Sequence, residues 1–443
     1  MSEKNANSIN RRTFVKKASG LAATSFVAPQ LLQAKAHYDG ADVIKVGLIG
    51  CGGRGAGAAF QALSTEQNIQ LVAMGDAFRD RLDGTYDYIK GELENNELDA
   101  SRLNVAEENK FVGFDAYEKV IPLVDVVILT TPPGFRPMHF EAAIKANKHV
   151  FMEKPVATDV PGIRKVLAVA EEAKKKKLNV VVGLQRHYEK QYQVWVDMLH
   201  GGVIGDIVTS RVYWNSGGVW VRERKPGMTE MEYQMRNWYY FNWLCGDHIC
   251  EQHIHNLDVG NWVKQAHPVK AQGIGGRLVR TGKDHGEIFD HHIVEYTYAD
   301  GSKMMSQCRH MPGCYNQVTE AFHGTSGTAP HPGKILSKSG YAILDRNARK
   351  DKNPYQVEHD VLFKAIANGE YKFADAENGA KATMTAILGR MATYSGQEIN
   401  WEDAMKSNLS LMPERFAWDA NPPILPNADG YYPVAIPGVT KVM

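Results

Sequence analysis

The first half of the chain alternates short apolar runs with stretches whose apolar positions have helical spacing. This alternation predicts a parallel sheet with helices on both faces. The predicted helices begin near residue 54 and run over 162–177, and the predicted strands cover 44–49, 69–74, 124–130, 149–152 and 179–184. We therefore expect a doubly wound Rossmann domain over residues 37–186.

The pattern changes after residue 187. Alternating apolar and polar positions are typical of an antiparallel sheet with one wet face, and they occur at 207–213, 292–298 and 303–308. Tyr298 to Gly301 predicts a hairpin turn between the last two runs. Two helical stretches, 357–368 and 378–395, are expected to pack on this sheet. The fold class is thus α/β, with a second α+β domain over 187–443 built on a large, mostly antiparallel, open-faced sheet.

The first 36 residues have the features of an export signal. Arg11 and Arg12 precede a weakly apolar stretch over 18–32, and Ala34 and Ala36 supply a small-residue cleavage site. The paired arginines indicate the twin-arginine route. Because the apolar stretch is too short to span a bilayer, we expect a soluble periplasmic protein with no membrane span.

Composition narrows the class of partner. Of the 443 residues, 44% are hydrophobic and 23% charged, as in ordinary two- or three-domain globular proteins. Without the signal the net charge is about −4, which excludes nucleic acid as the expected partner. The five cysteines show no CxxC spacing, so we expect buried thiols, with neither a disulfide framework nor a structural zinc site.

A glycine-rich turn directly follows the first predicted strand. Gly50, Gly52 and Gly55 match the GxGxxG pattern, in which they allow a tight turn, backbone approach to a pyrophosphate and close helix packing. Asp76 ends the next strand, where its carboxylate would accept hydrogen bonds from the adenosine ribose and repel a 2′-phosphate. The motif predicts bound NAD, and two nearby arginines leave NADP as an alternative.

A second motif follows the later strands. Residues 126–133 read VVILTTPP, His139 comes next, and residues 146–155 read ANKHVFMEKP. Together they resemble the hallmark stretch of the glucose–fructose oxidoreductase-like, or Gfo/Idh/MocA, family, and the resemblance covers nearly all of the chain after the signal. It implies that Lys154 lies beside the nicotinamide and assists proton transfer. The predicted cofactor-binding residues are Gly50, Gly52, Gly53, Arg54, Gly55, Asp76, Thr131, Pro132, His139, Glu153 and Lys154.

The resemblance implies a second catalytic element, in which an acid is followed by a histidine four residues on and by another acid three further. Glu251, His255 and Asp258 take these positions, and on one helix their spacing places them on one face. A carboxylate there would orient an imidazole that acts as general base on a sugar hydroxyl while hydride leaves the same carbon. The predicted catalytic residues are Lys154, His255 and Glu251.

A metal site is the alternative interpretation of this segment, since Glu251, His253, His255 and Asp258 are all ligand types. On a helix, His253 lies about 200° from Glu251. We therefore predict that no metal is bound.

Aromatic residues interleaved with hydrogen-bonding groups flank these elements. Such a mixture suits a pyranose ring, which has apolar faces and a polar rim. The predicted substrate-binding residues are Arg186, Tyr188, Trp214, Arg236, Trp238, His255 and Asp258.

The export signal bears on the mechanism because a protein outside the cytoplasm has no supply of NAD. We expect the chain to carry a bound cofactor that each catalytic cycle regenerates. An oxidoreductase that oxidises one sugar and reduces another meets this demand and is favoured by the Glu-Lys-Pro motif. The alternatives are a redox-neutral glycoside hydrolase, acting by oxidation, elimination, water addition and reduction, and a non-catalytic sugar-binding protein that retains NAD. The resemblance also implies a homodimer or homotetramer formed through the open sheet face.

Overall fold

The computed structural model describes residues 42–347 and 351–443, and the predicted export signal lies outside these ranges. All of the described residues fall within one compact unit, residues 37–443. Within these ranges, no helix combines the length and the apolar character that a membrane crossing requires.

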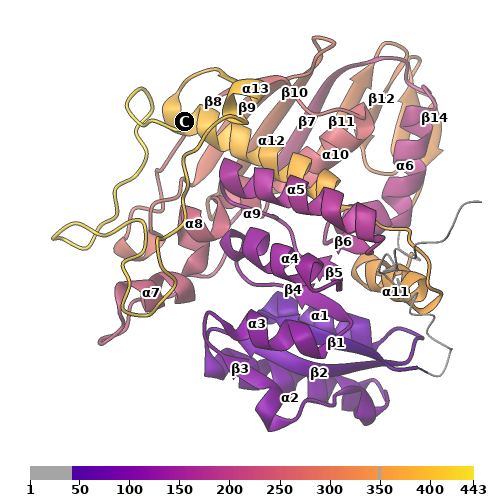
Figure 1. The fold of residues 1–443 in the computed structure, drawn as a ribbon. Helices are drawn as coiled ribbons and strands as arrows, with labels where there is room; N and C mark the ends of the chain where they lie inside the picture. The colour runs from indigo at the N-terminus through magenta and orange to yellow at the C-terminus, as the bar shows by residue number, and fades with distance from the viewer. Residues whose placement is uncertain (1–41, 348–350) are drawn as a thin grey trace, which may run out of the picture. The chain divides into compact units, whose positions relative to one another are not determined.

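The first layer of the fold is a six-stranded parallel sheet (Figure 1). Its strands are β1 (Ile44–Ile49), β2 (Ile69–Asp76), β3 (Lys110–Val112), β4 (Val126–Leu129), β5 (His149–Met152) and β6 (Val180–Val182). They lie in the order β3-β2-β1-β4-β5-β6. The accompanying helices are α1 (Gly53–Leu63), α2 (Arg79–Asn95), α3 (Ala116–Val120), α4 (Arg136–Lys145) and α5 (Val160–Lys176). This arrangement confirms the predicted doubly wound domain.

Strand β4 shows why this sheet forms. All four of its residues are buried, as expected for a central parallel strand covered on both faces. Val127 and Leu129 pack into the hydrophobic core shared with α4 and α5, whereas Val126 and Ile128 pack into the core shared with α1 and α2. The sheet therefore presents the carboxyl ends of its strands at one edge, where ligands bind in this fold.

The second layer is a nine-stranded sheet. Its strands are β7 (Ile207–Ser216), β8 (Lys270–Gly276), β9 (His291–Thr297), β10 (Lys303–His310), β11 (Gln317–Gly324), β12 (Gly327–His331), β13 (Lys334–Ser337), β14 (Ala342–Asp345) and β15 (Ile399–Asn400). They lie in the order β14-β13-β12-β11-β7-β10-β9-β8-β15, and the one parallel pair in this described sheet is β7 with β10. The prediction of a mostly antiparallel sheet is confirmed.

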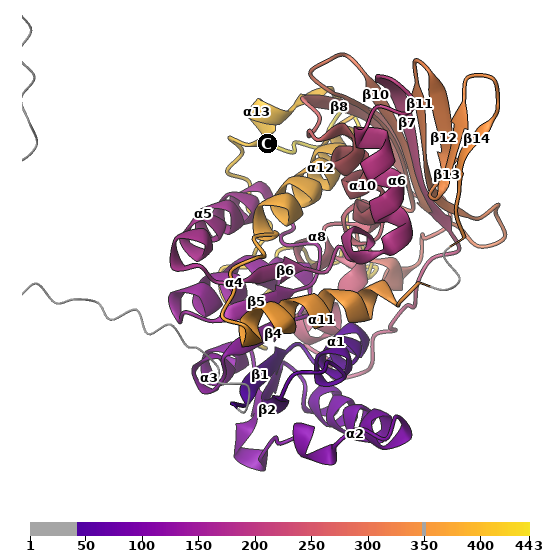
Figure 2. The same cartoon turned by 90° about the vertical axis from the view of Figure 1, so that its right-hand side faces the viewer.

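The helices of the second half are α6 (Lys190–His200), α7 (Glu230–Arg236), α8 (Asn242–Cys245), α9 (His248–Glu251), α10 (Ile254–Lys264), α11 (Pro354–Ala367), α12 (Ala376–Ser395) and α13 (Trp401–Ala404). Figure 2 shows α6, α10 and α12 on one face of the nine-stranded sheet, with the opposite face left open.

The prediction that both late helices pack on the large sheet is correct for α12 and wrong for α11. Leu362, Phe363 and Ile366 of α11 join the hydrophobic core of the dinucleotide domain, on the side of α1. The apolar stripe of α11 therefore packs on α1, and α12 covers the large sheet instead.

The cysteines follow the expectation with one exception. Four are buried thiols, but Cys314 is exposed because it lies in the turn between β10 and β11.

Candidate active site

A cavity of about 630 Å³ lies at the carboxyl edge of the parallel sheet. Its walls come from the dinucleotide domain and from the second half of the chain. Ten of the eleven predicted cofactor-binding residues line it: Gly50, Gly52, Gly53, Arg54, Asp76, Thr131, Pro132, His139, Glu153 and Lys154. The exception, Gly55, lies behind the turn.

The glycine turn is tightly built. Gly50 has a φ of +99°, and a Cβ there would lie 2.4 Å from the Thr131 nitrogen. A Cβ on Gly55 would lie 2.0 Å from the Gly50 oxygen, so the helix–strand approach requires glycine. A Cβ on Gly52 would meet nothing within 4 Å, and α1 has no side-chain cap. The first backbone N–H groups of α1 can therefore donate hydrogen bonds to a phosphate. The residues of the turn thus fit a dinucleotide.

Asp76 ends β2 and borders the cavity. Its carboxylate accepts hydrogen bonds from the Cys51 nitrogen at 2.6 Å and the Phe78 nitrogen at 2.8 Å. Burial raises the pKa of Asp76, and these two backbone N–H groups oppose that rise. The carboxylate is thus held in the position where an adenosine ribose would be bound.

Arg54 links the turn to the distant helix α11. Its Nε donates to Glu153, and its Nη2 lies 3.1 Å from Oε1 of the buried Glu358. The guanidinium also lies 5.0 Å from the ring centroid of Tyr355, which borders the cavity. Arg54 therefore lies at the predicted site, but its guanidinium is already engaged by Glu153 and Glu358.

Lys154 and Glu251 meet across the cavity. Lys154 follows β5, in a segment that includes a cis Lys154–Pro155 bond, and its Nζ donates to the Glu251 backbone oxygen at 2.7 Å and to Oε1 at 3.3 Å. Burial raises the pKa of Glu251 to about 7, although Lys154 opposes the shift. The Glu251 carboxyl can therefore exchange a proton near neutral pH.

His255 borders the same cavity, with its ring stacked on Trp214 at a centroid separation of 5.9 Å. Burial lowers its pKa well below the ordinary value, with further lowering by Lys154 and Arg186. Its Nδ1 has no hydrogen-bond partner within the described part of the chain. The imidazole is therefore neutral and able to accept a proton.

The predicted single helix carrying both acids and the histidine is wrong. Helix α9 ends at Glu251 and α10 begins at Ile254. The interruption directs Glu251 toward Lys154 instead of toward His255. Asp258 does not border the cavity; its Oδ2 lies 2.7 Å from His187 Nε2.

The predicted substrate residues divide into two groups. Trp214, Arg236, Trp238 and His255 border the cavity. Arg186, Tyr188 and Asp258 do not, because each is engaged elsewhere: Arg186 pairs with Glu320, and the Tyr188 hydroxyl donates to Asp375 at 2.6 Å.

Among the residues of the cavity wall that the sequence analysis missed are Arg136, Trp220 and Tyr355. Arg136 begins α4, and its position three residues before the predicted His139 was the available signal. Trp220 lies in the loop before α7. Tyr355 comes from α11, and no local signal connects it with the glycine turn.

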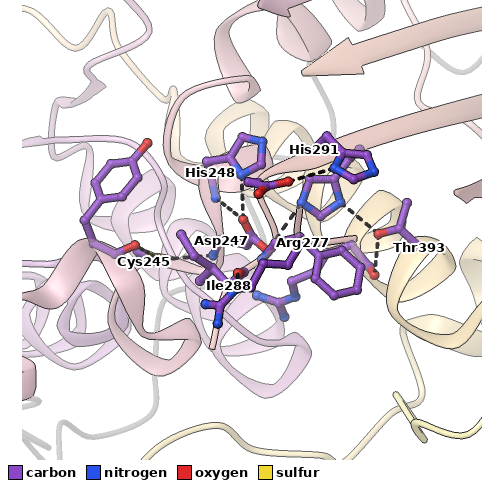
Figure 3. A network of polar contacts seen from close by, with 12 residues as sticks. Cys245, Asp247, His248, Arg277, Ile288, His291 and Thr393 are labelled. Carbon is purple, nitrogen blue, oxygen red and sulfur yellow. Dashed lines mark hydrogen bonds and ion pairs between the residues drawn. The ribbon is translucent and has the colours of Figure 1, made fainter. Parts of the chain in front are cut away.

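The alternative metal set does not converge. Glu251, His253, His255 and Asp258 contact different partners, and His253 Nε2 lies 2.8 Å from Ser306 Oγ. A different group of metal-ligand types comes together in the described residues: Asp247, His248 and His292, all fully buried. Figure 3 shows Asp247 and His248 within their network of polar contacts.

The Asp247 carboxylate is already satisfied by hydrogen bonds. It accepts from His248 Nδ1 at 2.8 Å, from the Phe289 nitrogen at 3.0 Å and from the Tyr394 hydroxyl at 2.5 Å, and His292 Nε2 lies 3.3 Å away. These donors come from α9, the segment at β9 and α12. The group therefore anchors the start of α9, which ends in a predicted catalytic residue.

The parallel sheet, the glycine turn and the acidic residue at the end of β2 define a dinucleotide-binding domain of the oxidoreductase type. Residues 44–183 match the model of the Gfo/Idh/MocA oxidoreductase family, described by its NAD-binding Rossmann fold. The resemblance inferred from the motifs and the predicted cofactor class are confirmed.

Curated relatives cover most of the chain. The inositol 2-dehydrogenase of Ralstonia nicotianae is 28% identical over 80% of this chain and 95% of its own length. The inositol 2-dehydrogenase of Serratia proteamaculans is 25% identical over the same shares. The solved scyllo-inositol dehydrogenase from Lactobacillus casei, with bound NAD(H) and scyllo-inositol, has a TM-score of 0.60 at 17% identity and covers 82% of this chain and 100% of its own. This last likeness shows that the fold is shared.

Proposed function

We propose that the protein is an NAD-dependent oxidoreductase that transfers hydride between a carbohydrate or polyol CH–OH group and the nicotinamide. The observation that carries the proposal is the meeting of Lys154, Glu251 and His255 in the cavity that also holds the glycine turn. The relatives named as inositol dehydrogenases support a polyhydroxylated ring as the substrate class.

Each polar residue has a distinct role in this chemistry. The bound dinucleotide supplies the hydride acceptor. The neutral His255 accepts the hydroxyl proton as general base. Lys154, whose Nζ donates to Glu251, would assist this single proton transfer by donating a hydrogen bond to the reacting oxygen, and Trp214 offers an apolar face to the ring.

We further propose that the chain is exported by the twin-arginine route and carries its NAD with it. Arg11 and Arg12 support export to the periplasm, and a cofactor regenerated in each cycle would remove the need for free NAD. Cell fractionation tests localisation, with an Arg11→Lys, Arg12→Lys double variant expected to stay in the cytoplasm.

The test of catalysis is turnover without added NAD. The purified protein is incubated with sugars, polyols and aryl glycosides. Paired oxidised and reduced products support the oxidoreductase, and hydrolysis of the glycosides would identify the redox-neutral alternative. Bound NAD without any turnover would assign a binding role, and a strict need for added NAD would refute the retained cofactor.

We also propose a homo-oligomer formed through the open face of the large sheet. Ile274, Ile293 and Met305 are exposed on β8, β9 and β10, and Ile274 pairs with Ile293 across the strands. Sedimentation analysis tests this, with Ile274→Glu expected to give a monomer.

A further inference from the structure

A fully buried arginine begins helix α4 and borders the cavity. The side chain of Arg136 is 1% exposed, and the residue contributes to the cavity wall together with Thr131 and Lys154. Arginine is rarely buried unless an anion accompanies it.

The contacts of Arg136 are incomplete. Nη2 donates to the Thr131 backbone oxygen at 2.7 Å, and Nη1 lies 3.5 Å from its hydroxyl. Nε has no hydrogen-bond partner within residues 42–347 and 351–443. No carboxylate of those residues lies within ion-pair distance of the guanidinium, although 29 other ion-pair contacts fall in the same ranges.

The neighbouring carboxylates are already paired with other cations. Glu153 and Glu251 act electrostatically on Arg136. Glu153 accepts from Arg54, and Glu251 accepts from Lys154. The positive charge of Arg136 therefore has no carboxylate of its own in the described structure.

The balance of charge around Arg136 is positive. Burial lowers its pKa to about 10, so the guanidinium is still charged at neutral pH. Burial and the nearby Glu153 raise the pKa of Glu358 well above its ordinary value, which favours a neutral carboxyl beside Arg54. Burial also lowers the pKa of His139 to about 3, so this imidazole adds no charge. An uncompensated buried charge is unfavourable unless a ligand supplies the counter-ion.

We propose that Arg136 is an oxyanion-binding residue, whose counter-ion is a phosphate or carboxylate oxygen of the ligand in the cavity. This site rests on the proposed function only in that the cavity holds a dinucleotide and a sugar. The two sources of the oxyanion are the cofactor pyrophosphate and an acidic group on the sugar. Thr131 touches the Gly50 turn, where a pyrophosphate would lie, whereas Glu251 marks the end of the cavity where a sugar would react.

The first measurement is the thermal stability of the nucleotide-free protein. Arg136→Met removes the buried charge and keeps an unbranched side chain, so its Tm should exceed that of the wild type. The matched control is Arg164→Met, because Arg164 donates to the Met405 and Ser407 backbone oxygens at 2.9 and 2.6 Å and lies outside the cavity wall. Its Tm should fall. A fall for Arg136→Met as well would assign Arg136 to a structural role and overturn the proposal.

The second measurement is calorimetric titration with ADP-ribose, which carries the pyrophosphate but no nicotinamide. If the oxyanion is the pyrophosphate, Arg136→Met weakens ADP-ribose binding by about tenfold to a hundredfold. Arg136→Lys weakens this binding less, and Arg164→Met binds ADP-ribose with the affinity of the wild type. This result needs no turnover, so it would stand even if no sugar were oxidised.

The third measurement distinguishes the acidic sugar. If ADP-ribose binding is unchanged in Arg136→Met, glucuronate and glucose are titrated into NAD-loaded protein. Loss of a preference for glucuronate in the variant supports a carboxylate as the counter-ion. The proposal would be overturned if wild type and Arg136→Met bind ADP-ribose, glucuronate and glucose with equal affinities. If Arg136→Met does not fold, Arg136→Lys replaces it in all of these titrations.

Discussion

The buried acid beside Lys154 makes a sharp prediction about stability and pH. Glu251 has its pKa raised by burial from 4.5 to about 7. Because the folded state binds the proton more tightly than the unfolded chain, stability should fall as pH rises from about 4.5 to about 7 and stay level above that. A rise of this size corresponds to about 3 kcal/mol of stability lost on ionisation.

Glu251→Gln removes the ionisation while keeping an acceptor for the amine. Lys154 Nζ also donates to the backbone oxygen of residue 251 at 2.7 Å, which the substitution leaves in place. The free energy of unfolding of the variant, relative to wild type, should therefore increase by about 3 kcal/mol between pH 4.5 and 7.5. The other titrating groups of the protein cancel in this difference.

The assay is denaturant unfolding of nucleotide-free protein at constant ionic strength across this pH range. Glu94→Gln, which changes an exposed acid on α2, is the control and should follow the wild-type curve. Parallel curves for wild type and Glu251→Gln would refute the reasoning, because they would mean that Glu251 ionises equally well in the folded and unfolded states.

Three further predictions concern the site. Lys154→Met should lower kcat for sugar oxidation by about a hundredfold or more through loss of proton transfer, measured as NADH absorbance in single turnovers; an unchanged kcat would remove Lys154 from the mechanism. Gly55→Ala should abolish dinucleotide binding and lower Tm, because the new Cβ would lie 2.0 Å from the Gly50 oxygen. The control is Gly84→Ala in α2, where the new Cβ would have no atom within 4 Å. This substitution should stabilise the protein by about 0.5–1 kcal/mol. Asp76→Ala should reduce the preference for NAD over NADP by about tenfold, and equal preference in both proteins would argue against the ribose contact.

The parts of the site that could be predicted are those carried by neighbouring residues. The strand–turn–helix unit at Gly50 and the end of β5 at Lys154 each depend on a few consecutive residues, so their local pattern predicts their position. The buried β4 run and the alternating runs of β9 and β10 predict the two kinds of sheet for the same reason.

The parts that could not be predicted depend on contacts between distant residues. The spacing of Glu251, His255 and Asp258 assumes a continuous helix, but the chain turns at His253 between α9 and α10, and the His253 imidazole bonds to Ser306 on β10. Tertiary contacts of this kind override the helical pattern. The burial of Arg186 beside Glu320, 134 positions away, likewise has no local signal.

The return of α11 to the dinucleotide domain has a consequence for how the protein is made. Arg54 is paired with Glu358, and the two are separated by 304 positions in the chain. A ribosome therefore releases the strands and the glycine turn long before it releases the helix that completes their core and pairs with Arg54. Since domains fold as units during synthesis, the nucleotide site should become complete only after about four-fifths of the chain has emerged. Nucleotide capture is then a late event of biosynthesis, and a ribosome-stalled chain ending before residue 354 should not retain NAD.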